Sequence, residues 1–215
     1  MSRRTSLSIS VRRHFVDEFF YRKAVAIQPE SRVIDIGGHK GEKRGNFNIE
    51  TFTPLVTYVN IDKSRNPDIQ ASADNIPVEA SSFDIALMGE LLEHVENPLS
   101  VLKEAKRILK PGGKILATVP FMYPLHGDPD DFARYTGPFW QKAAQEAGFS
   151  DMEIEMQGSM PAVAALMIQH LFRARGVSWR PIQNSLVRCL MWLDRRTENE
   201  LLKSWTTGFG LTLTK

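Results

Sequence analysis

The chain has 215 residues, of which 42% are hydrophobic and 24% are charged, proportions typical of one folded globular domain. Its 27 lysines and arginines nearly balance 25 aspartates and glutamates, so the net charge of +2 does not favour nucleic acid as a partner. We see no apolar run long enough to span a bilayer and no secretory signal. The single cysteine, Cys189, excludes an internal disulfide framework, and its helical apolar surroundings predict core packing. These features indicate a cytoplasmic protein.

Residues 1–30 are predicted to form a helical lead-in to a domain that spans residues 1–215. Aromatic and aliphatic residues recur at helical spacing from Val11 to Ile27, and Pro29 ends the pattern. The basic, hydroxyl-rich start of this segment is interpreted as a lead-in, although an organelle-targeting peptide has a similar composition.

Strands and helices alternate through the middle of the chain. A helix capped by Asn97, with Pro98 at its first position, is predicted to end at the sequence Pro111-Gly112-Gly113. A second helix is predicted over residues 137–147. The predicted strands are Arg32–Ile36, Thr57–Ile61, Phe83–Met88 and Lys114–Val119. This alternation predicts an α/β, Rossmann-like fold, with a mostly parallel sheet flanked by helices on both faces.

The last third of the chain contains two more alternating segments, 151–157 and 206–214, of which the second could close the sheet. Between them lies a basic helical insertion, residues 158–205, with apolar helix faces. We expect these helices to cover the sheet. A peripheral membrane contact through residues 160–196, a lid over a lipid-linked or hydrophobic acceptor, and a dimer contact are the alternatives.

The sequence VIDIGGHKG marks a strand that opens into a glycine-rich loop. The spacing of Gly37, Gly38 and Gly41 does not fit the dinucleotide fingerprint, and no P-loop Gly-Lys-Ser/Thr follows. Asp35 could accept hydrogen bonds from an ammonium group, and Asp62, at the end of the next strand, could bind a ribose diol. These residues favour S-adenosylmethionine, which has no phosphate, as the ligand.

This loop, Asp62 and the segment SADNIPVEASSFDIALMGELLEHVENPLSVLKEAKRILKPGGKILATVPF resemble the class I S-adenosylmethionine-dependent methyltransferases, and most closely their bacterial small-molecule and saccharide-type branch. The resemblance covers residues 32–149. It implies a seven-stranded sheet whose last strand is antiparallel, with S-adenosylmethionine as the cofactor. The implied cofactor residues are Asp35, Gly37, Gly38, Gly41 and Asp62, then Ser72, Ala73 and Asp74 beside the adenine, and Gly89 and Glu90 beside the middle of the cofactor.

Two positions depart from the family pattern. His39 replaces the central glycine of the family's loop, and Ser72 replaces a common adenine-contacting acid. The pocket is therefore either altered or degenerate.

The long loop of residues 120–136 is expected to bind the methyl acceptor, because it lies above the carboxyl ends of the strands. It resembles the H-x-x-P-x-D-(F/Y)-x-R-Y-T loop of methyltransferase-like proteins from surface-polysaccharide and natural-product pathways. A neutral imidazole can remove a hydroxyl proton, so we predict that His126 is the general base. The predicted acceptor-binding residues are His94, Tyr123, Arg134 and Tyr135. In the alternative interpretation, Arg134 pairs with Asp131 and His126 only caps the loop.

Glu90, Glu93, His94 and His126 offer a further alternative, because their oxygen and nitrogen atoms could bind a divalent ion. A similar E-x-x-E-H string followed by a distant histidine occurs in small-RNA 2′-O-methyltransferases and in some ubiquinone-pathway O-methyltransferases, where a metal can chelate vicinal oxygens of the acceptor. Many relatives with this string bind no metal, and we assign no metal ligand.

The sequence thus predicts a methyltransferase that transfers a methyl group to an oxygen of a small-molecule or saccharide acceptor. This acceptor would be lipid-linked or hydrophobic if the insertion is a lid. The alternatives are a non-catalytic binding protein with a degenerate methyltransferase fold, a metal-assisted methyltransferase for a vicinal diol, and an NAD-dependent dehydrogenase. We expect no nucleic-acid partner, and the sequence does not give the oligomeric state.

Overall fold

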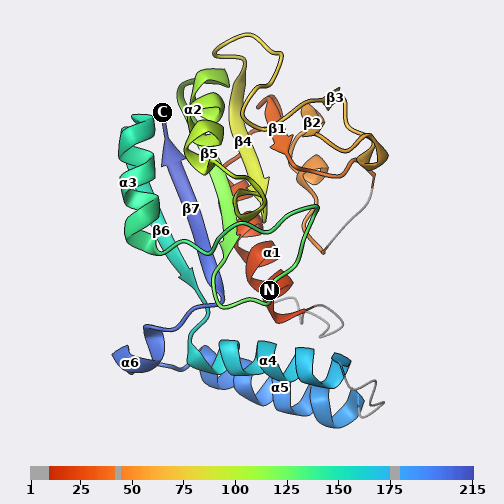
Figure 1. Cartoon of the computed structure of the whole chain (residues 1–215), viewed down its shortest axis with the longest axis vertical. Helices are drawn as coiled ribbons and strands as arrows, with labels where there is room; N and C mark the ends of the chain where they lie inside the picture. The colour runs from red at the N-terminus through yellow and green to blue at the C-terminus, as the bar shows by residue number, and fades with distance from the viewer. Residues whose placement is uncertain (1–9, 42–44, 175–179) are drawn as a thin grey trace.

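The computed structural model describes residues 10–41, 45–174 and 180–215, so residues 1–9 of the predicted lead-in lie outside it. Its centre is a seven-stranded sheet of order β3-β2-β1-β4-β5-β7-β6 (Figure 1). Among the described strands, β7 alone runs opposite to the others, so it pairs antiparallel with both β5 and β6. This confirms the predicted fold class. The strands are β1 (Val33–Ile36), β2 (Val56–Asn60), β3 (Ile69–Gln70), β4 (Phe83–Gly89), β5 (Leu109–Pro120), β6 (Asp151–Gln157) and β7 (Gly208–Thr214).

Helix α1 (Val11–Ala24) covers one face of the sheet. It begins at Ser10, whose side chain accepts a hydrogen bond from the backbone N–H of Arg13. Phe19 and Phe20 of this helix are buried in one cluster with Leu87 and Leu116 of the two central strands. The apolar residues that recur at helical spacing in the lead-in therefore form the face of α1 that packs on the sheet.

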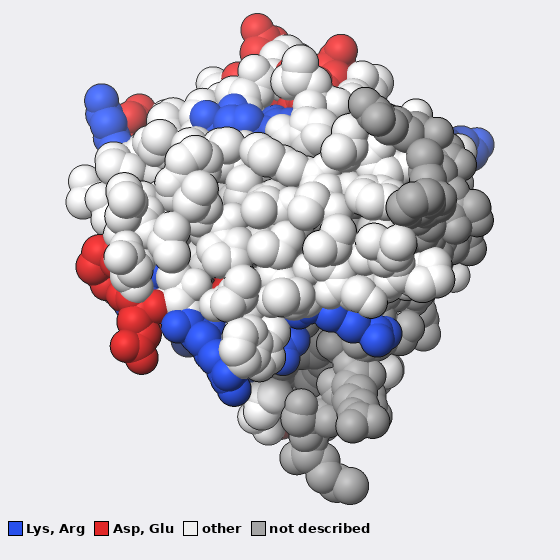
Figure 2. All heavy atoms as spheres, turned by 90° about the horizontal axis from the view of Figure 1, so that it is seen from below, with Lys and Arg blue, Asp and Glu red and all other residues white. Residues whose placement is uncertain are grey.

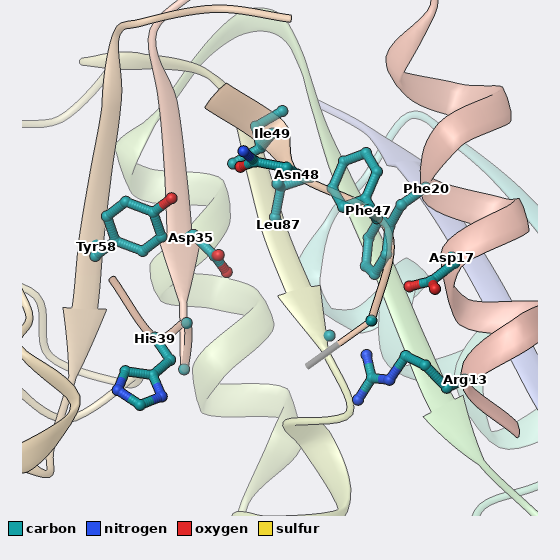
Figure 3. Close-up of a pocket in the computed structure, with 14 residues that line it drawn as sticks. Arg13, Asp17, Phe20, Asp35, His39, Phe47, Asn48, Ile49, Tyr58 and Leu87 are labelled. Atoms are coloured by element: carbon teal, nitrogen blue, oxygen red, sulfur yellow. The ribbon is translucent and has the colours of Figure 1, made fainter. Parts of the chain in front are cut away.

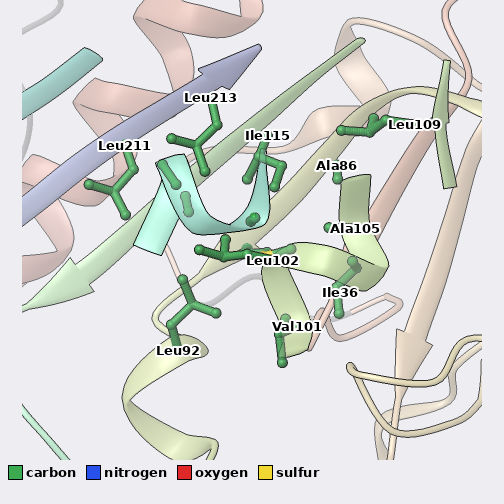
Figure 4. Packing of buried hydrophobic residues seen from close by; sticks show 14 of the residues in the cluster. Ile36, Ala86, Leu92, Val101, Leu102, Ala105, Leu109, Ile115, Leu211 and Leu213 are labelled. Carbon is green, nitrogen blue, oxygen red and sulfur yellow. The ribbon is translucent and has the colours of Figure 1, made fainter. Parts of the chain in front are cut away.

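Helices α2 (Pro98–Ile108) and α3 (Gly137–Ala147) cover the other face, where the largest hydrophobic cluster lies (Figure 4). The Asn97 side chain caps α2 by accepting from the backbone N–H of Ser100, and Gly148 ends α3 in the left-handed conformation with φ of 80°. Leu102 and Trp140 are both about 1% exposed. The two predicted helices are confirmed.

The end of α2 differs from the prediction. The sequence Pro111-Gly112-Gly113 does not end the helix, because the chain is already extended at Leu109, where β5 begins and pairs with Phe83. Gly112 then adopts a φ of 75°, and the register with β4 shifts between Phe83 and Ile85. The glycines therefore allow an irregularity inside the strand.

Short 3₁₀ helices replace α-helices in several connections. They are η1 (Ile49–Thr51), η2 (Lys63–Arg65) and η3 (Leu92–His94). In the described part of residues 37–48, between β1 and η1, the chain forms no helix, as the unfavourable helix start after the glycines predicts. The loop after β1 is thus held by contacts with its neighbours rather than by a helix.

The C-terminal insertion forms α4 (Met160–Ala174), α5 (Arg180–Asp194) and the short α6 (Glu200–Lys203). The expectation that it covers the sheet is wrong: α4 and α5 form a hairpin beneath the carboxyl edge of the parallel strands (Figure 1). Small residues allow close approach of α4 to the start of α1, where Val11 and Phe15 pack with Ala162, Ala165 and Leu166.

The packing predicted for Cys189 is also wrong. This residue is exposed, because the buried side of α5 is formed by Val187 and Met191, and Cys189 lies on the other side of the helix. Within the residues that the structure describes, no helix combines the length and apolarity needed to cross a bilayer.

Candidate active site at the carboxyl edge of the sheet

The glycine loop begins where β1 ends, beside the ends of β2 and β4. The backbone N–H of Gly37 donates to Val59 O at 2.8 Å, and the φ of Gly37 is +80°. A Cβ atom at Gly38 would lie only 2.4 Å from the carboxylate carbon of Asp35. This turn therefore requires glycine for two reasons: a left-handed backbone and close approach of the Asp35 side chain.

A small cavity of about 120 Å³ opens at this turn (Figure 3). Asp35 points into it from β1, whereas the ring of His39 is turned away from Asp35, toward the Tyr58 side. His39 therefore lines the cavity without blocking the carboxylate. Drug-sized ligands occupy roughly 300–1,000 Å³, so the cavity could enclose only part of S-adenosylmethionine. The residues that line it also include Gly37, Gly38, Gly45, Phe47, Asn48, Ile49, Leu87 and Gly89.

Helix α1 contributes Arg13, Asp17 and Phe20 to the same cavity, a contribution that the sequence analysis missed. Asp17 accepts a hydrogen bond of 2.8 Å from the backbone N–H of Asn46, and burial raises the pKa of its carboxyl. A signal was present in the sequence: Arg13 and Asp17 are charged residues one helical turn apart in a helix that also carries a buried face.

Asp62 lies at the same edge, at the end of β2, but it does not line the cavity. Its carboxylate accepts from the backbone N–H and the hydroxyl of Ser64 at 2.8 and 2.7 Å, and these hydrogen bonds lower its pKa. Asn60 connects the two segments, because it donates to Gly38 O at 3.0 Å and accepts from the N–H of Asp62 at 2.9 Å. The structure therefore places Asp35 and Asp62 at adjacent strand ends.

The other predicted cofactor residues are spread along this edge. Gly41 has a φ of +85° and open space around the position of a Cβ, so backbone conformation alone favours glycine there. Ser72 donates to the carboxylate of Asp74 within a turn, and Ala73 between them packs against the main core. Gly89, at the end of β4, lines the cavity.

Glu90 forms a buried ion pair that the sequence did not reveal. The Nε and Nη2 atoms of Arg12 donate to its two carboxylate oxygens at 2.9 and 2.7 Å, and Arg12 is 3% exposed. Burial raises the pKa of Glu90, but the Arg12 guanidinium more than offsets this, so the pKa lies below its ordinary value. Arg12 also donates to Gln157 Oε1 at 2.5 Å and to Val119 O at 2.9 Å. The pair ties α1 to the ends of three strands.

Glu93 lies in η3, close to two imidazoles. Its Oε1 atom is 3.6 Å from His94 Nε2 and 4.0 Å from His126 Nε2, and the two imidazole rings meet edge to face at 4.9 Å. The side chain is only 2% exposed, and neither carboxylate oxygen has a hydrogen-bond partner in the described structure. Burial, together with the charge of Glu90, raises the pKa of Glu93 to about 9, so this carboxyl is protonated at neutral pH.

The loop of residues 121–136 crosses the carboxyl edge and brings His126 to Glu93 (Figure 1). Asp131 holds the loop, because its carboxylate accepts from the backbone N–H of His126 at 2.8 Å and pairs with Arg134. The Nδ1 atom of His126 is 3.2 Å from Pro124 O and 3.5 Å from Asp131 Oδ2. The Nη2 atom of Arg134, a donor, also lies 3.4 Å from Nδ1, so Nε2 can accept a proton in the tautomer that uses the two acceptors rather than this donor.

The predicted acceptor-binding residues occupy different places. Arg134 is engaged by Asp131, as in the structural alternative considered from the sequence. Tyr123 packs edge to face against His126, with a centroid distance of 5.0 Å. Tyr135 stacks on Phe139 at 3.9 Å and contacts Trp140, so it belongs to an aromatic cluster on α3.

The donor set for a divalent ion is smaller than the sequence suggested. Arg12 occupies both oxygens of Glu90, so the four-residue set is reduced to Glu93, His94 and His126. One ligand atom from each of these three lies within 4.8 Å of the others. The oxygen and nitrogen donors, and the buried carboxylate without a hydrogen-bond partner, fit a transition-metal ion or zinc.

Comparisons with known proteins agree with this architecture. Residues 15–117 match the family model described as "Methyltransferase domain". A malonyl-[acyl-carrier protein] O-methyltransferase from Alcanivorax borkumensis is 25% identical over 169 residues, covering 69% of this chain and 56% of that protein.

Two solved structures share the fold. A SAM-dependent methyltransferase from Archaeoglobus fulgidus superposes with a TM-score of 0.60, at 14% identity and 94% coverage of both chains. The Haemonchus contortus phosphoethanolamine N-methyltransferase 2, solved with S-adenosyl-L-methionine, has a TM-score of 0.52 at 16% identity and covers 94% of this chain and 55% of that one.

Residues 15–117, just under half of the chain, are similar to a methyltransferase domain, and the sheet belongs to a fold that S-adenosylmethionine-dependent methyltransferases share. The predicted fold is therefore confirmed, and one of the two solved structures contains S-adenosyl-L-methionine. The chain spans 44%, 32% and 56% of the length of the first three curated relatives that it matches.

Proposed function

We propose that the protein is an S-adenosylmethionine-dependent methyltransferase that methylates an oxygen of a small-molecule or saccharide acceptor. One observation carries the proposal: the glycine loop and the Glu93 cluster adjoin each other. A Cβ at Gly37 would lie 2.9 Å from the side chain of Leu91, and Leu91 immediately precedes η3, which carries Glu93 and His94. A methyl donor at the loop would therefore lie near the candidate base His126, whose Nε2 atom is 4.0 Å from Glu93 Oε1.

The residues of the edge fit the cofactor in distinct ways. The Asp35 carboxylate and the bare backbone of Gly37 and Gly38 would receive the amino-acid part, and Asp62, partly exposed at the end of β2, could reach the ribose hydroxyls. The bound group supplies an electrophilic methyl on a sulfonium. The narrow enclosed cavity would hold only one end of the molecule.

His126 would remove the acceptor proton. As an acceptor hydroxyl attacks the methyl carbon, an oxygen–carbon bond forms, the sulfur–carbon bond breaks, and the hydroxyl proton passes to His126 Nε2. The Asp131 carboxylate, 3.5 Å from Nδ1, would stabilise the resulting imidazolium. Tyr123, which packs on His126, would limit the space for the acceptor. The similarity to an O-methyltransferase supports oxygen as the target atom.

The experiment is a screen of hydroxyl-bearing small molecules and saccharides with radiolabelled methyl donor. The proposal predicts label transfer to at least one hydroxyl acceptor by the purified protein. Asp35→Ala should abolish transfer, whereas Val25→Ala, an exposed change at the far end of α1, should not. Binding of the donor without transfer to any acceptor would instead favour a non-catalytic protein with a degenerate pocket.

A metal-assisted reaction on a vicinal diol is a second candidate, favoured by the Glu93, His94 and His126 donor set. A divalent ion there would act as a Lewis acid on the two acceptor oxygens. Repeating the screen with chelator and with added divalent ions separates the two mechanisms. Chelation should abolish methyl transfer only if the reaction is metal-assisted. In either case we place the protein in the cytoplasm, a compartment that fits its single cysteine.

A further inference from the structure

The helical hairpin has two different sides. Its inner side packs on α1 and reaches the acceptor loop, where His170 of α4 meets Tyr123 edge to face at 5.6 Å. Its outer side faces away from the sheet, and Figure 2, which views the molecule from that direction, shows a broad face without charged residues. This outer side has no partner in the described structure.

Large apolar side chains are arranged in a stripe on each helix. On α4, Met160, Met167 and Leu171 follow helical spacing and are 41%, 55% and 53% exposed. On α5, Ile182, Leu186 and Leu193 also follow helical spacing, and they are 49%, 43% and 42% exposed. Steps of four and seven residues keep each stripe on one side of its helix. Exposed apolar groups in this arrangement indicate a docking surface rather than scattered surface residues.

Positive charge accompanies the stripes. Residues 160–196 contain six arginines and one aspartate, a net charge of +5 in a chain whose total is +2. The aspartate, Asp194, is already engaged by the backbone N–H and hydroxyl of Ser159 at 2.7 and 2.6 Å. In Figure 2 basic side chains lie along the upper and lower rims of the uncharged face, with acidic side chains at its left and at the top. Arg196 lies over the ring of Trp192, 4.0 Å from its centroid, and Trp192 is 51% exposed.

We propose that the outer side of the α4–α5 hairpin docks on an anionic lipid bilayer. The apolar stripes would enter the region between headgroups and acyl chains, and the arginines would meet the negatively charged headgroups. A second copy of this chain fits less well, because an isologous dimer would bring together two copies of a segment, residues 160–196, whose net charge is +5. The acceptor loop lies on the inner side of the same hairpin, so, if the proposed function holds, docking would present it to a lipid-linked hydroxyl acceptor.

Cys189 provides a direct probe, because it is the single cysteine of the chain, is exposed, and lies between Leu186 and Leu193 on the α5 stripe. A polarity-sensitive fluorophore on Cys189 should shift its emission to the blue with vesicles of equimolar phosphatidylcholine and phosphatidylglycerol. It should not shift with phosphatidylcholine alone, and salt should weaken the effect. The test needs no cofactor and no acceptor, so it is independent of the proposed activity.

Vesicle sedimentation of unlabelled protein provides the second measurement. Leu186→Asp and Met167→Asp should each weaken binding to the anionic vesicles by roughly tenfold or more, because each places a charge in the apolar stripe. Val25→Asp, at an apolar site that is even more exposed and lies at the other end of the molecule, is the control and should bind as the wild type does. Circular dichroism verifies the fold of each variant.

Two results would overturn the proposal. One is wild-type protein that does not bind the anionic vesicles at low salt. The other is binding that is unchanged in both stripe variants. A concentration-dependent dimer that Leu186→Asp disrupts, together with no vesicle binding, would assign the face to self-association instead.

Discussion

Glu93 and His126 are the residues whose surroundings say most about the chemistry. The burial of Glu93 removes its charge at neutral pH, and the Nε2 atom of His126 lies 4.0 Å from Glu93 Oε1. Arg134, which the sequence suggested for the acceptor, instead holds the loop through Asp131. The proposed base, His126, and the ion pair that holds its backbone, Asp131–Arg134, therefore come from one short loop.

Replacement of His126 tests its role as the base. His126→Gln should lower kcat by roughly 10²–10⁴-fold, because general-base catalysis contributes about that much, while the affinity for S-adenosylmethionine stays unchanged. Steady-state kinetics and calorimetry on the same preparation measure both. A variant that keeps its kcat would exclude His126 as the base.

The Asp131–Arg134 pair predicts an acid-dependent loss of stability. The hydrogen bonds from Arg134 lower the pKa of Asp131 to about 2, against an ordinary value of 3.8. Because the folded-state pKa is lowered, the pair stabilises the protein above pH 4 and loses its effect as the pH falls toward 2. This lowering of the pKa corresponds to about 2 kcal/mol of unfolding free energy.

The measurement is urea unfolding of the wild type and of Asp131→Asn at several pH values. The difference in unfolding free energy between the two proteins should be largest near neutral pH and should shrink below pH 4. A difference that stays constant down to pH 2 would show that the carboxylate charge does not matter.

At the scale of elements, the sequence predicted most strands and helices because periodicity, caps and glycines act locally. Asn97 and Gly148 sit at the helix ends where expected. The start of β5 was misjudged because Leu109 pairs with Phe83, a contact that local propensity does not encode. The position of the hairpin was misjudged for the same reason, since an apolar helix face does not say which partner it packs on.

The residues of the candidate site that lie at strand ends could be predicted from the sequence. Those that α1 contributes could not. Asp35 and the glycines follow directly from their motif. Arg12 looks like part of a basic lead-in, although it falls on the same helical stripe as Val16 and Phe19, and this was the signal for its burial. Its partner Glu90 is far away in the chain, so only the fold reveals the pair.

The Arg12–Glu90 pair should be a structural link between α1 and the sheet. Arg12→Met leaves a buried, unpaired carboxylate and should lower the free energy of unfolding by about 3–5 kcal/mol. Adding Glu90→Gln to this variant removes that charge and should restore part of the loss.

Arg22→Met is the matched control on the same helix. Arg22 pairs with Glu155 at the surface with a half-exposed side chain, so its loss should cost about 1 kcal/mol or less. Urea unfolding compares the three variants. Equal losses for Arg12→Met and Arg22→Met would contradict the account of a buried link.

At the scale of the whole molecule, the hairpin is a peripheral unit beside a larger sandwich of helices and sheet. Its cluster is built from a few residues of α1, α4 and α5, whereas the main cluster extends across the central strands, α2 and α3. Local stability follows such differences in buried apolar contacts. Movement of the hairpin relative to the sheet would suit it either as a docking surface or as a lid.

Hydrogen exchange should reveal this difference. Amides of α4 and α5 should exchange faster than those of β4 and β5, through an opening that leaves the sheet intact. Mass spectrometry of peptides from the intact protein measures both groups at once. Equal protection of the hairpin and the central strands would show that they open only together.

The central claim is that the glycine loop at the carboxyl edge binds S-adenosylmethionine, and calorimetry tests it most directly. The account predicts one bound S-adenosylmethionine per chain and no binding of NADH. Gly38→Ala should abolish binding, because its Cβ would displace the Asp35 carboxylate, whereas Gly137→Ala, whose Cβ would make only an ordinary contact of 4.0 Å with Phe209, should bind normally. No heat from S-adenosylmethionine with the wild type, or unchanged binding by Gly38→Ala, would contradict the account.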